Sequence, residues 1–272
     1  MVLEEVKQDE LNQIFDGNSK NVLNYLLQRT VLSYPEFLPS QNNTELYLEK
    51  KQCEQWIVQA LGLKPLGAGS YPIDGINNKN GYDVSSLALA QSKNGEMASQ
   101  TGEKSLGQKF DDENFGENEE TLDSLYATRS SEKIINSWKK ILKKKWKKTI
   151  DDHELNYLYL VNLILYKPKK QLYIFLLKVN YEKLEEISKD KMTTKSVFIK
   201  NFIDSKIGNV KIYKSKKRME LRIRPQELIK NKSYLSFNIN NKTSSKNLRD
   251  IFDNNKKLKD YCEKEIKKYK EF

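Results

Sequence analysis

The pattern of apolar and polar residues divides the chain into a helical part and a strand-rich part. Before residue 66, apolar residues recur at the three- and four-residue spacing of amphipathic helices, the first of them beginning near Leu3. From about residue 155 to 238 they form short alternating or continuous runs rich in β-branched and aromatic side chains, which predicts strands. We expect strands at 155–166, 170–179, 197–202, 209–213, 219–224 and 234–238, and a short helical crossover at 181–190.

A basic amphipathic helix is predicted at residues 130–148, just before the strands. Its apolar stripe contains Ile134, Trp138, Leu142 and Trp146, and lysines occupy its other faces. Such a helix can lie on a membrane surface, bind an acidic partner or follow phosphates. Because no lipidation signal or second anchor accompanies it, we favour phosphates or a simply solvated face.

These elements predict an α/β protein with a mixed, largely central β-sheet and flanking helices. We divide the chain into an N-terminal helical segment at 1–66, a core at 67–240 with basic strands, and a charged helical tail at 241–272, together forming one compact domain. The glycine-containing polar stretch 91–108 is expected to be a loop, and 111–124 an acidic solvated segment.

The charge balance indicates a polyanionic partner. Lys and Arg number 48 against 37 Asp and Glu, which gives a formal net charge of +11. A generic lysine-rich composition would give the same total, so the placement of the charges matters more. Cys53 and Cys262 match no metal-ligand spacing, and no apolar run approaches a membrane span. We therefore expect reduced thiols in a cytoplasmic protein that does not associate with membranes.

The candidate chemistry lies in the stretch 67–93. Segments 71–74 and 82–85 are separated by an Asn-, Lys- and Gly-rich run at 75–81, which predicts a hairpin with that run as its loop. Pairing of the two arms brings Asp74 close to Asp83, and two adjacent carboxylates repel unless a cation joins them. The sequence thus predicts a divalent-metal site. The one histidine, His153, lies in a polar run, which argues against a histidine-dependent triad.

This stretch resembles the PD-(D/E)XK nucleases, the superfamily that holds most type II restriction endonucleases. Pro72 and Asp74 match the first motif, Asp83 matches the second acid, and Glu49 on the preceding helix matches the glutamate that such a helix often contributes. The resemblance implies a restriction-endonuclease-like mixed sheet flanked by helices, with Mg²⁺ held by Asp74, Asp83 and Glu49. It further implies hydrolysis of a phosphodiester bond in double-stranded DNA.

The sequence departs from the family at Ser85, where the pattern has a catalytic lysine. Ser85 faces the same side of its strand as Asp83, so it occupies the position of the catalytic lysine but offers a hydroxyl instead of an ammonium group. Lys93 or Lys104 could fill the role. Alternatively, the site is degenerate and only binds DNA, or the second motif is the run 91–93 with Asp74 or Asp83 as the first acid.

Basic residues of the later strands are the candidate DNA contacts, because arginine reads guanine edges and lysine and hydroxyl groups hold phosphates. The expected function is that of a sequence-specific type II restriction endonuclease, with a homodimer as a possible assembly. The alternative is a non-catalytic DNA- or RNA-binding protein on a degenerate nuclease scaffold. The candidate contacts are Thr194, Lys195, Lys214, Lys216, Lys217, Arg218, Arg222 and Arg224.

Overall fold

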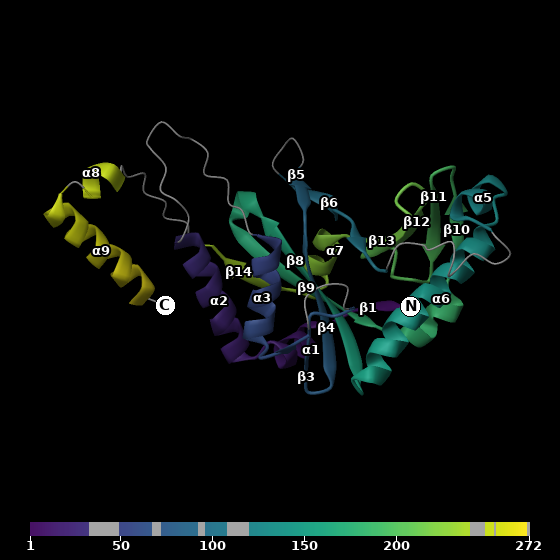
Figure 1. The fold of residues 1–272 in the computed structure, drawn as a ribbon, viewed down its shortest axis with the longest axis horizontal. Helices are drawn as coiled ribbons and strands as arrows, with labels where there is room; N and C mark the ends of the chain where they lie inside the picture. Colours follow the sequence, from purple (N-terminus) through teal and green to yellow (C-terminus); the bar gives the residue numbers. More distant parts are fainter. Residues whose placement is uncertain are drawn as a thin grey trace.

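A mixed β-sheet forms the centre of the α/β fold (Figure 1). The computed structural model describes residues 1–32, 49–66, 72–91, 96–107, 120–239, 248–252 and 254–270. The strands of this central sheet are β1 (Leu3–Glu5), β2 (Lys64–Pro65), β3 (Gly75–Asn77), β4 (Asn80–Leu87), β8 (Tyr157–Tyr166), β9 (Gln171–Val179) and β14 (Leu235–Asn238). Their order is β1-β9-β8-β4-β3-β2, with β14 also pairing with β9.

Strands β4 and β8 run parallel, whereas β3–β4 and β8–β9 are antiparallel pairs. A parallel pair needs a long crossover, and α6 (Ser131–Asp152) lies within it. The antiparallel pairing of β8 with β9 confirms the predicted long hairpin. Both strands are continuous apolar runs because both faces of the sheet are buried there. The short helix η1 (Lys167–Lys169) connects the two strands.

The N-terminus differs from the predicted pattern. Leu3 starts a strand that pairs antiparallel with β9, with Leu3 opposite Val179, rather than a helix. Three residues cannot show a helical or strand period, and the unpaired edge of β9 decides the conformation. The helices begin later, as α1 (Gln8–Ile14), α2 (Gly17–Leu32) and α3 (Lys50–Ala60).

A second sheet contains β10 (Ser188–Met192), β11 (Ser196–Lys200), β12 (Gly208–Tyr213), β13 (Arg218–Ile223) and β7 (Lys104–Ser105), in the order β10-β11-β12-β13-β7. Two expectations are corrected here. The described part of 91–108 is largely extended, as β6 (Met97–Thr101), which pairs with β5 (Leu89–Gln91), and β7. The stretch 181–190 forms a 3-10 helix, η2 (Tyr181–Glu186), followed by β10. Pairing with neighbouring strands outweighs the weak local pattern in both places.

The two faces of the central sheet are covered differently (Figure 1). On one face, Tyr82 and Val161 pack with Trp56 of α3 and with side chains of α1 and α2. On the other face, Leu160 and Phe175 belong to the core that contains Trp138 and Trp146 of α6 and the inward residues of β12 and β13. The alternation of side chains along β8 therefore serves two separate cores.

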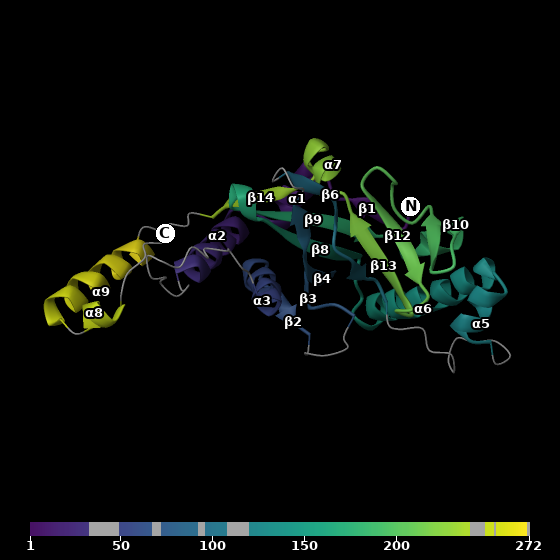
Figure 2. The same cartoon turned by 90° about the horizontal axis from the view of Figure 1, so that it is seen from above.

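The remaining helices lie around the second sheet and at one end of the molecule. Both views place α8 and α9 beyond α2, away from both sheets (Figure 1, Figure 2). None of the helices within the described residues combines the length and apolarity needed to cross a membrane. The remaining α-helices are α5 (Leu122–Ala127), α7 (Pro225–Lys230), α8 (Leu248–Phe252) and α9 (Asn255–Lys270).

Candidate active site

The predicted hairpin exists, but its loop is shorter than expected. Only Asn78 and Lys79 form the turn, with positive φ values of 47° and 61°, and residues 75–77 and 80–81 belong to the strands. Two consecutive residues of positive φ suit the twist of a tight hairpin. Asp74 and Asp83 therefore lie at the open end of the hairpin, away from the turn.

Asp74 is fixed across the hairpin by hydrogen bonds. Its N–H donates to the Tyr82 carbonyl at 2.8 Å, and the Val84 N–H donates to Asp74 Oδ2 at 2.6 Å. The side chain thus takes the place that a backbone carbonyl would have in a longer β3. This arrangement directs the Asp74 carboxylate towards β4 next to Asp83, the residue that precedes Val84.

The electrostatic environment of Asp74 disfavours its charged form. Burial raises the pKa of the Asp74 carboxyl above its ordinary value, and the negative charges of Asp83 and Glu54 raise it further. The Val84 hydrogen bond and the Lys104 charge oppose this rise. Acidic charges from β4 and α3 therefore act on one partly buried carboxylate, which is the situation that a bound cation relieves.

Two lysines approach Asp83 from different elements. Lys104 of β7 is 4 % exposed, and its Nζ lies 3.1 Å from Asp83 Oδ1 and 3.4 Å from the Asp83 carbonyl oxygen. Lys145 of α6 places its Nζ 3.9 Å from Asp83 Oδ2 and donates to the Leu106 carbonyl at 3.2 Å. Of the two lysines named from the sequence, Lys104 thus lies in the site, whereas Lys93 falls outside the described residues.

Lys145 is a site residue that the sequence analysis missed. Burial lowers the pKa of its ammonium group, and the positive charge of Lys104 adds to that effect while Asp83 opposes it. A signal was present, because Lys145 falls at helical spacing among Ile141, Leu142 and Trp146, on the side of α6 that meets the core. A lysine on a buried stripe needs an acidic or polar partner.

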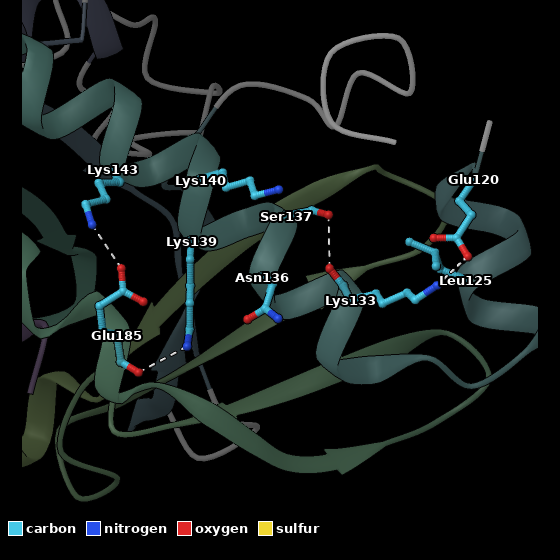
Figure 3. Close-up of a pocket in the computed structure, with 9 residues that line it drawn as sticks. All are labelled: Glu120, Leu125, Lys133, Asn136, Ser137, Lys139, Lys140, Lys143 and Glu185. Carbon is cyan, nitrogen blue, oxygen red and sulfur yellow. Dashed lines mark hydrogen bonds and ion pairs between the residues drawn. The ribbon is translucent and has the colours of Figure 1, made fainter. Parts of the chain in front are cut away.

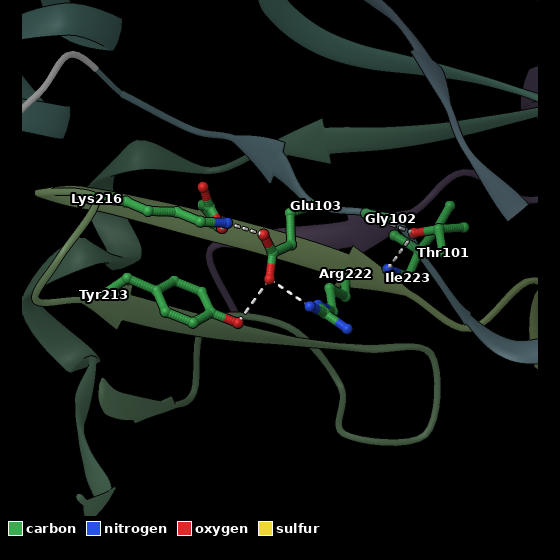
Figure 4. Close-up of polar contacts among 8 residues, drawn as sticks. Thr101, Gly102, Glu103, Tyr213, Lys216, Arg222 and Ile223 are labelled. Atoms are coloured by element: carbon green, nitrogen blue, oxygen red, sulfur yellow. Dashed lines mark hydrogen bonds and ion pairs between the residues drawn. The ribbon is translucent and has the colours of Figure 1, made fainter. Parts of the chain in front are cut away.

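Glu103 anchors the strand that carries Lys104. Neighbouring residues of a strand point to opposite faces, so Lys104 turns to Asp83 while Glu103 turns outward. Glu103 accepts hydrogen bonds from Lys216, Arg222 and the Tyr213 hydroxyl, the last at 2.7 Å (Figure 4). Although burial opposes ionisation, the Arg222 and Lys216 hydrogen bonds hold the pKa of Glu103 well below its usual range. The position of Lys104 therefore depends on an ion network of the second sheet.

The helix acid near the site is Glu54, not Glu49. Glu49 is the exposed N-cap residue of α3, whereas Glu54, one turn further along, is the residue whose charge acts on Asp74. The sequence pattern assigned Glu49 to this helix, but α3 begins at Lys50, directly after Glu49.

Ser85 lies two residues after Asp83 on β4, opposite Asn162 of β8. Asn162 is fully buried, and its Oδ1 has no hydrogen-bond partner among the described residues, which leaves an acceptor beside Ser85 inside the core.

The carboxylate pair fits a magnesium ion in its chemistry. Mg²⁺ prefers hard oxygen ligands and commonly uses one or two carboxylates together with water and substrate phosphate. Asp74 and Asp83 supply such oxygens, and the pKa of Asp74 is raised mainly by burial, with the negative charge of Asp83 adding to the rise. Within the described residues, no group of three or more His, Cys, Asp or Glu side chains is arranged to hold a metal. Among the described side chains, the two aspartates are therefore the carboxylates proposed to hold an ion.

The predicted DNA contacts collect on the second sheet. Lys195 and Lys214 are joined by a backbone hydrogen bond of 3.0 Å, so Thr194 and Lys195 lie beside the turn that carries Lys214, Lys216 and Lys217. Arg218 is exposed at the start of β13, and Arg222 and Arg224 follow towards its other end. Several of these side chains already bind acids: Lys214 pairs with Asp123 at 3.4 Å, and Lys216 and Arg222 with Glu103.

Comparison with family models, curated proteins and solved structures finds no match to this chain. The function is therefore inferred from the chemistry of the site itself.

Proposed function

We propose that this protein is a Mg²⁺-dependent endonuclease that hydrolyses double-stranded DNA at a specific sequence, as type II restriction enzymes do. The observation that carries the proposal is the convergence of Asp74, Asp83 and Lys104 from three separate strands or strand ends. The mixed sheet flanked by helices supports a restriction-endonuclease-like fold as part of the same proposal.

Each residue has a physical role in this reaction. Bound Mg²⁺ would polarise the scissile phosphate and lower the pKa of an attacking water. Asp74 and Asp83 would hold the ion through their carboxylate oxygens. Lys104 and Lys145, both within 4 Å of Asp83, would stabilise the negative charge that develops on the phosphate, which is the task of the lysine that Ser85 replaces.

The test is digestion of a large DNA of mixed sequence by the purified full chain, with Mg²⁺ or with EDTA. We expect discrete fragments with Mg²⁺ alone, and cleavage slower by at least about 10²-fold in Asp74→Asn and Asp83→Asn. Asp190→Asn is the control, because Asp190 is an exposed acid paired only with Lys200 on the second sheet's edge among the described residues. Uncut DNA under all metal conditions, or equal cleavage by all variants, would contradict the proposal.

One observation favours a second candidate, a non-catalytic DNA- or RNA-binding protein on the same scaffold. Lys104 already occupies Asp83 Oδ1, and Ser85 stands where the family has its lysine. An acid that is neutralised by an internal lysine binds a metal less readily. Salt-dependent nucleic-acid binding that is unchanged by Mg²⁺ and by Asp83→Asn, together with no cleavage, would identify this function.

A further inference from the structure

The exposed side of α6 carries a row of lysines, which we call the lysine strip: Lys140, Lys143, Lys144, Lys147 and Lys148. All five are exposed and line one shallow hollow together with Asp151 and Asp152 at the end of the helix. Residues three and four apart are neighbours on a helix surface, so Lys140, Lys144 and Lys148 form a continuous line, with Lys143 and Lys147 beside it.

The apolar side of α6 is committed to the protein core. Trp138 and Leu142 are fully buried, and Trp146 is 1 % exposed. An amphipathic helix binds a lipid surface by inserting its apolar side, and here that side is not available. The strip is therefore a rigid charged surface on a packed helix, and its partner must be recognised by charge.

Among the described residues, the outer part of the strip has no acid paired with it. In the described ranges, no ion pair joins Lys144, Lys147 or Lys148 to an acid. Lys143 does contact Glu185 at 3.0 Å, and Figure 3 shows Lys139 and Lys143 directed at that residue. Both members of the Lys143–Glu185 pair are largely exposed, at 51 % and 63 % of their side chains, and such pairs exchange readily for another anion.

The helix that carries the strip also reaches the candidate active site, through Lys145. Lys145 contacts Asp83, and Lys148 is its neighbour one helical turn on. From Lys140 to Lys148 the helix rises by about 12 Å, which corresponds to the axial rise of roughly three to four base pairs of a duplex at about 3.4 Å each. A strand that follows the strip towards its Lys148 end would therefore reach the helix turn from which Lys145 enters the site.

We propose that the lysine strip binds the phosphate backbone of double-stranded DNA and leads one strand to the Asp74–Asp83 site. The inference rests on the proposed function for its choice of partner, and it adds which surface holds the substrate. It assigns backbone contacts to α6, for which the sequence left phosphates and a solvated face open, in addition to the candidate contacts on and beside β11–β13.

The test uses the full chain and a fluorescent duplex, with Ca²⁺ or EDTA in place of Mg²⁺ so that binding is measured without cleavage. The variant Lys144→Gln, Lys147→Gln, Lys148→Gln removes three strip charges. Its matched control, Lys256→Gln, Lys257→Gln, Lys259→Gln, removes three exposed charges from α9. Anisotropy gives Kd over a range of salt concentrations, and circular dichroism melting checks that both variants fold.

We expect the strip variant to lose at least about tenfold in affinity at moderate salt and to flatten the slope of log K against log [salt] by about 2 to 3, one unit for each lost phosphate contact. The control should stay within about twofold with its slope unchanged.

The proposal would be overturned if both variants lost duplex affinity equally, or if the strip variant lost none. It would also be overturned if the wild-type protein bound anionic vesicles or single-stranded DNA but not the duplex. Cleavage with Mg²⁺ is scored separately. Binding through the strip without cleavage would reject the nuclease alone, and cleavage with normal Kd in the strip variant would reject the strip alone.

Discussion

Lys144, Lys147 and Lys148 of the lysine strip and the basic residues of β12, β13 and their turn carry the same charge but differ in their pairing with the described acids. On the strands, Lys216 and Arg222 are held by Glu103, and Lys214 pairs with Asp123. On the helix, Lys144, Lys147 and Lys148 form no ion pair with any described acid. A basic sequence run thus indicates charge but not availability, because internal acids distant in sequence decide which charges are free to meet a partner.

The acids of the two regions differ in the same way. Although burial opposes ionisation, hydrogen bonds from Arg222 and Lys216 hold the pKa of Glu103 well below the usual range, whereas burial and neighbouring acids raise the pKa of Asp74. Glu103 therefore fits a structural role in its ionised state. Asp74 is a partly buried acid beside a second acid, and the proposed function assigns a bound cation to this pair.

The largest effect on cleavage is expected from substitution of the two lysines that contact Asp83, Lys104 of β7 and Lys145 of α6. Under the proposed function, Lys104→Met should lower kcat for DNA cleavage by about 10²–10³-fold, as loss of a donor from a transition-state site does. Lys145→Met should lower kcat by about tenfold, since its ammonium group lies farther from Asp83. Single-turnover cleavage measures both, with the exposed Lys200→Met as control. Wild-type rates in both variants would exclude the two lysines from the reaction.

A smaller effect, with opposite signs on binding and cleavage, is expected from Glu103→Gln. Loss of the anchor should let Lys104 move and lower kcat by about tenfold. The same change removes the acid paired with Arg222, whereas Lys216 keeps its 3.3 Å contact with Glu220, so duplex affinity measured with Ca²⁺ should rise and the salt slope should steepen by about 1. A merely destabilised protein would lose both binding and cleavage, which would contradict the anchoring role.

The pH dependence of stability tests the same residue independently. The pKa of Glu103 is lowered in the folded protein, so its stabilising contribution is present above its unfolded pKa and is lost as the pH falls. Glu103→Gln should therefore lower Tm at neutral pH, and the difference should shrink below about pH 4. A difference that is independent of pH would show that the ion network does not stabilise the fold.

The smallest change in thermal stability is expected for Asp74→Asn, and its sign is opposite to that for Glu103→Gln. Because the pKa of Asp74 is raised in the folded protein, its contribution to stability is lost as the pH rises through that value. Asp74→Asn should therefore raise Tm at neutral pH, by no more than about 2–4 °C given solvent screening, and the gain should vanish in acid. Thermal melts from acid to neutral pH measure this, and a lower Tm at neutral pH would contradict it.

The long, strongly patterned elements were predictable from the sequence. The strands β8 and β9, the alternating β12 and β13, and α6 agree with the predicted ranges within a few residues, because each buries a complete apolar face. The prediction was wrong for β1, β7 and β10, which are short and take their conformation from the strands they pair with. Local propensity carries too little free energy to specify such edges.

The sequence by itself determined the acids of the site, the basic character of the molecule and the α/β class. Asp74 and Asp83 were found because a hairpin brings its two arms together whatever its surroundings. Only the tertiary structure decided which lysines join them and which basic residues remain exposed. Lys104 and Lys145 reach Asp83 from β7 and α6, and Glu103 captures Lys216 and Arg222 from β13 and its preceding turn. The physical reason is that ion pairs between distant segments depend on packing, and packing leaves no mark in the local spacing of charges.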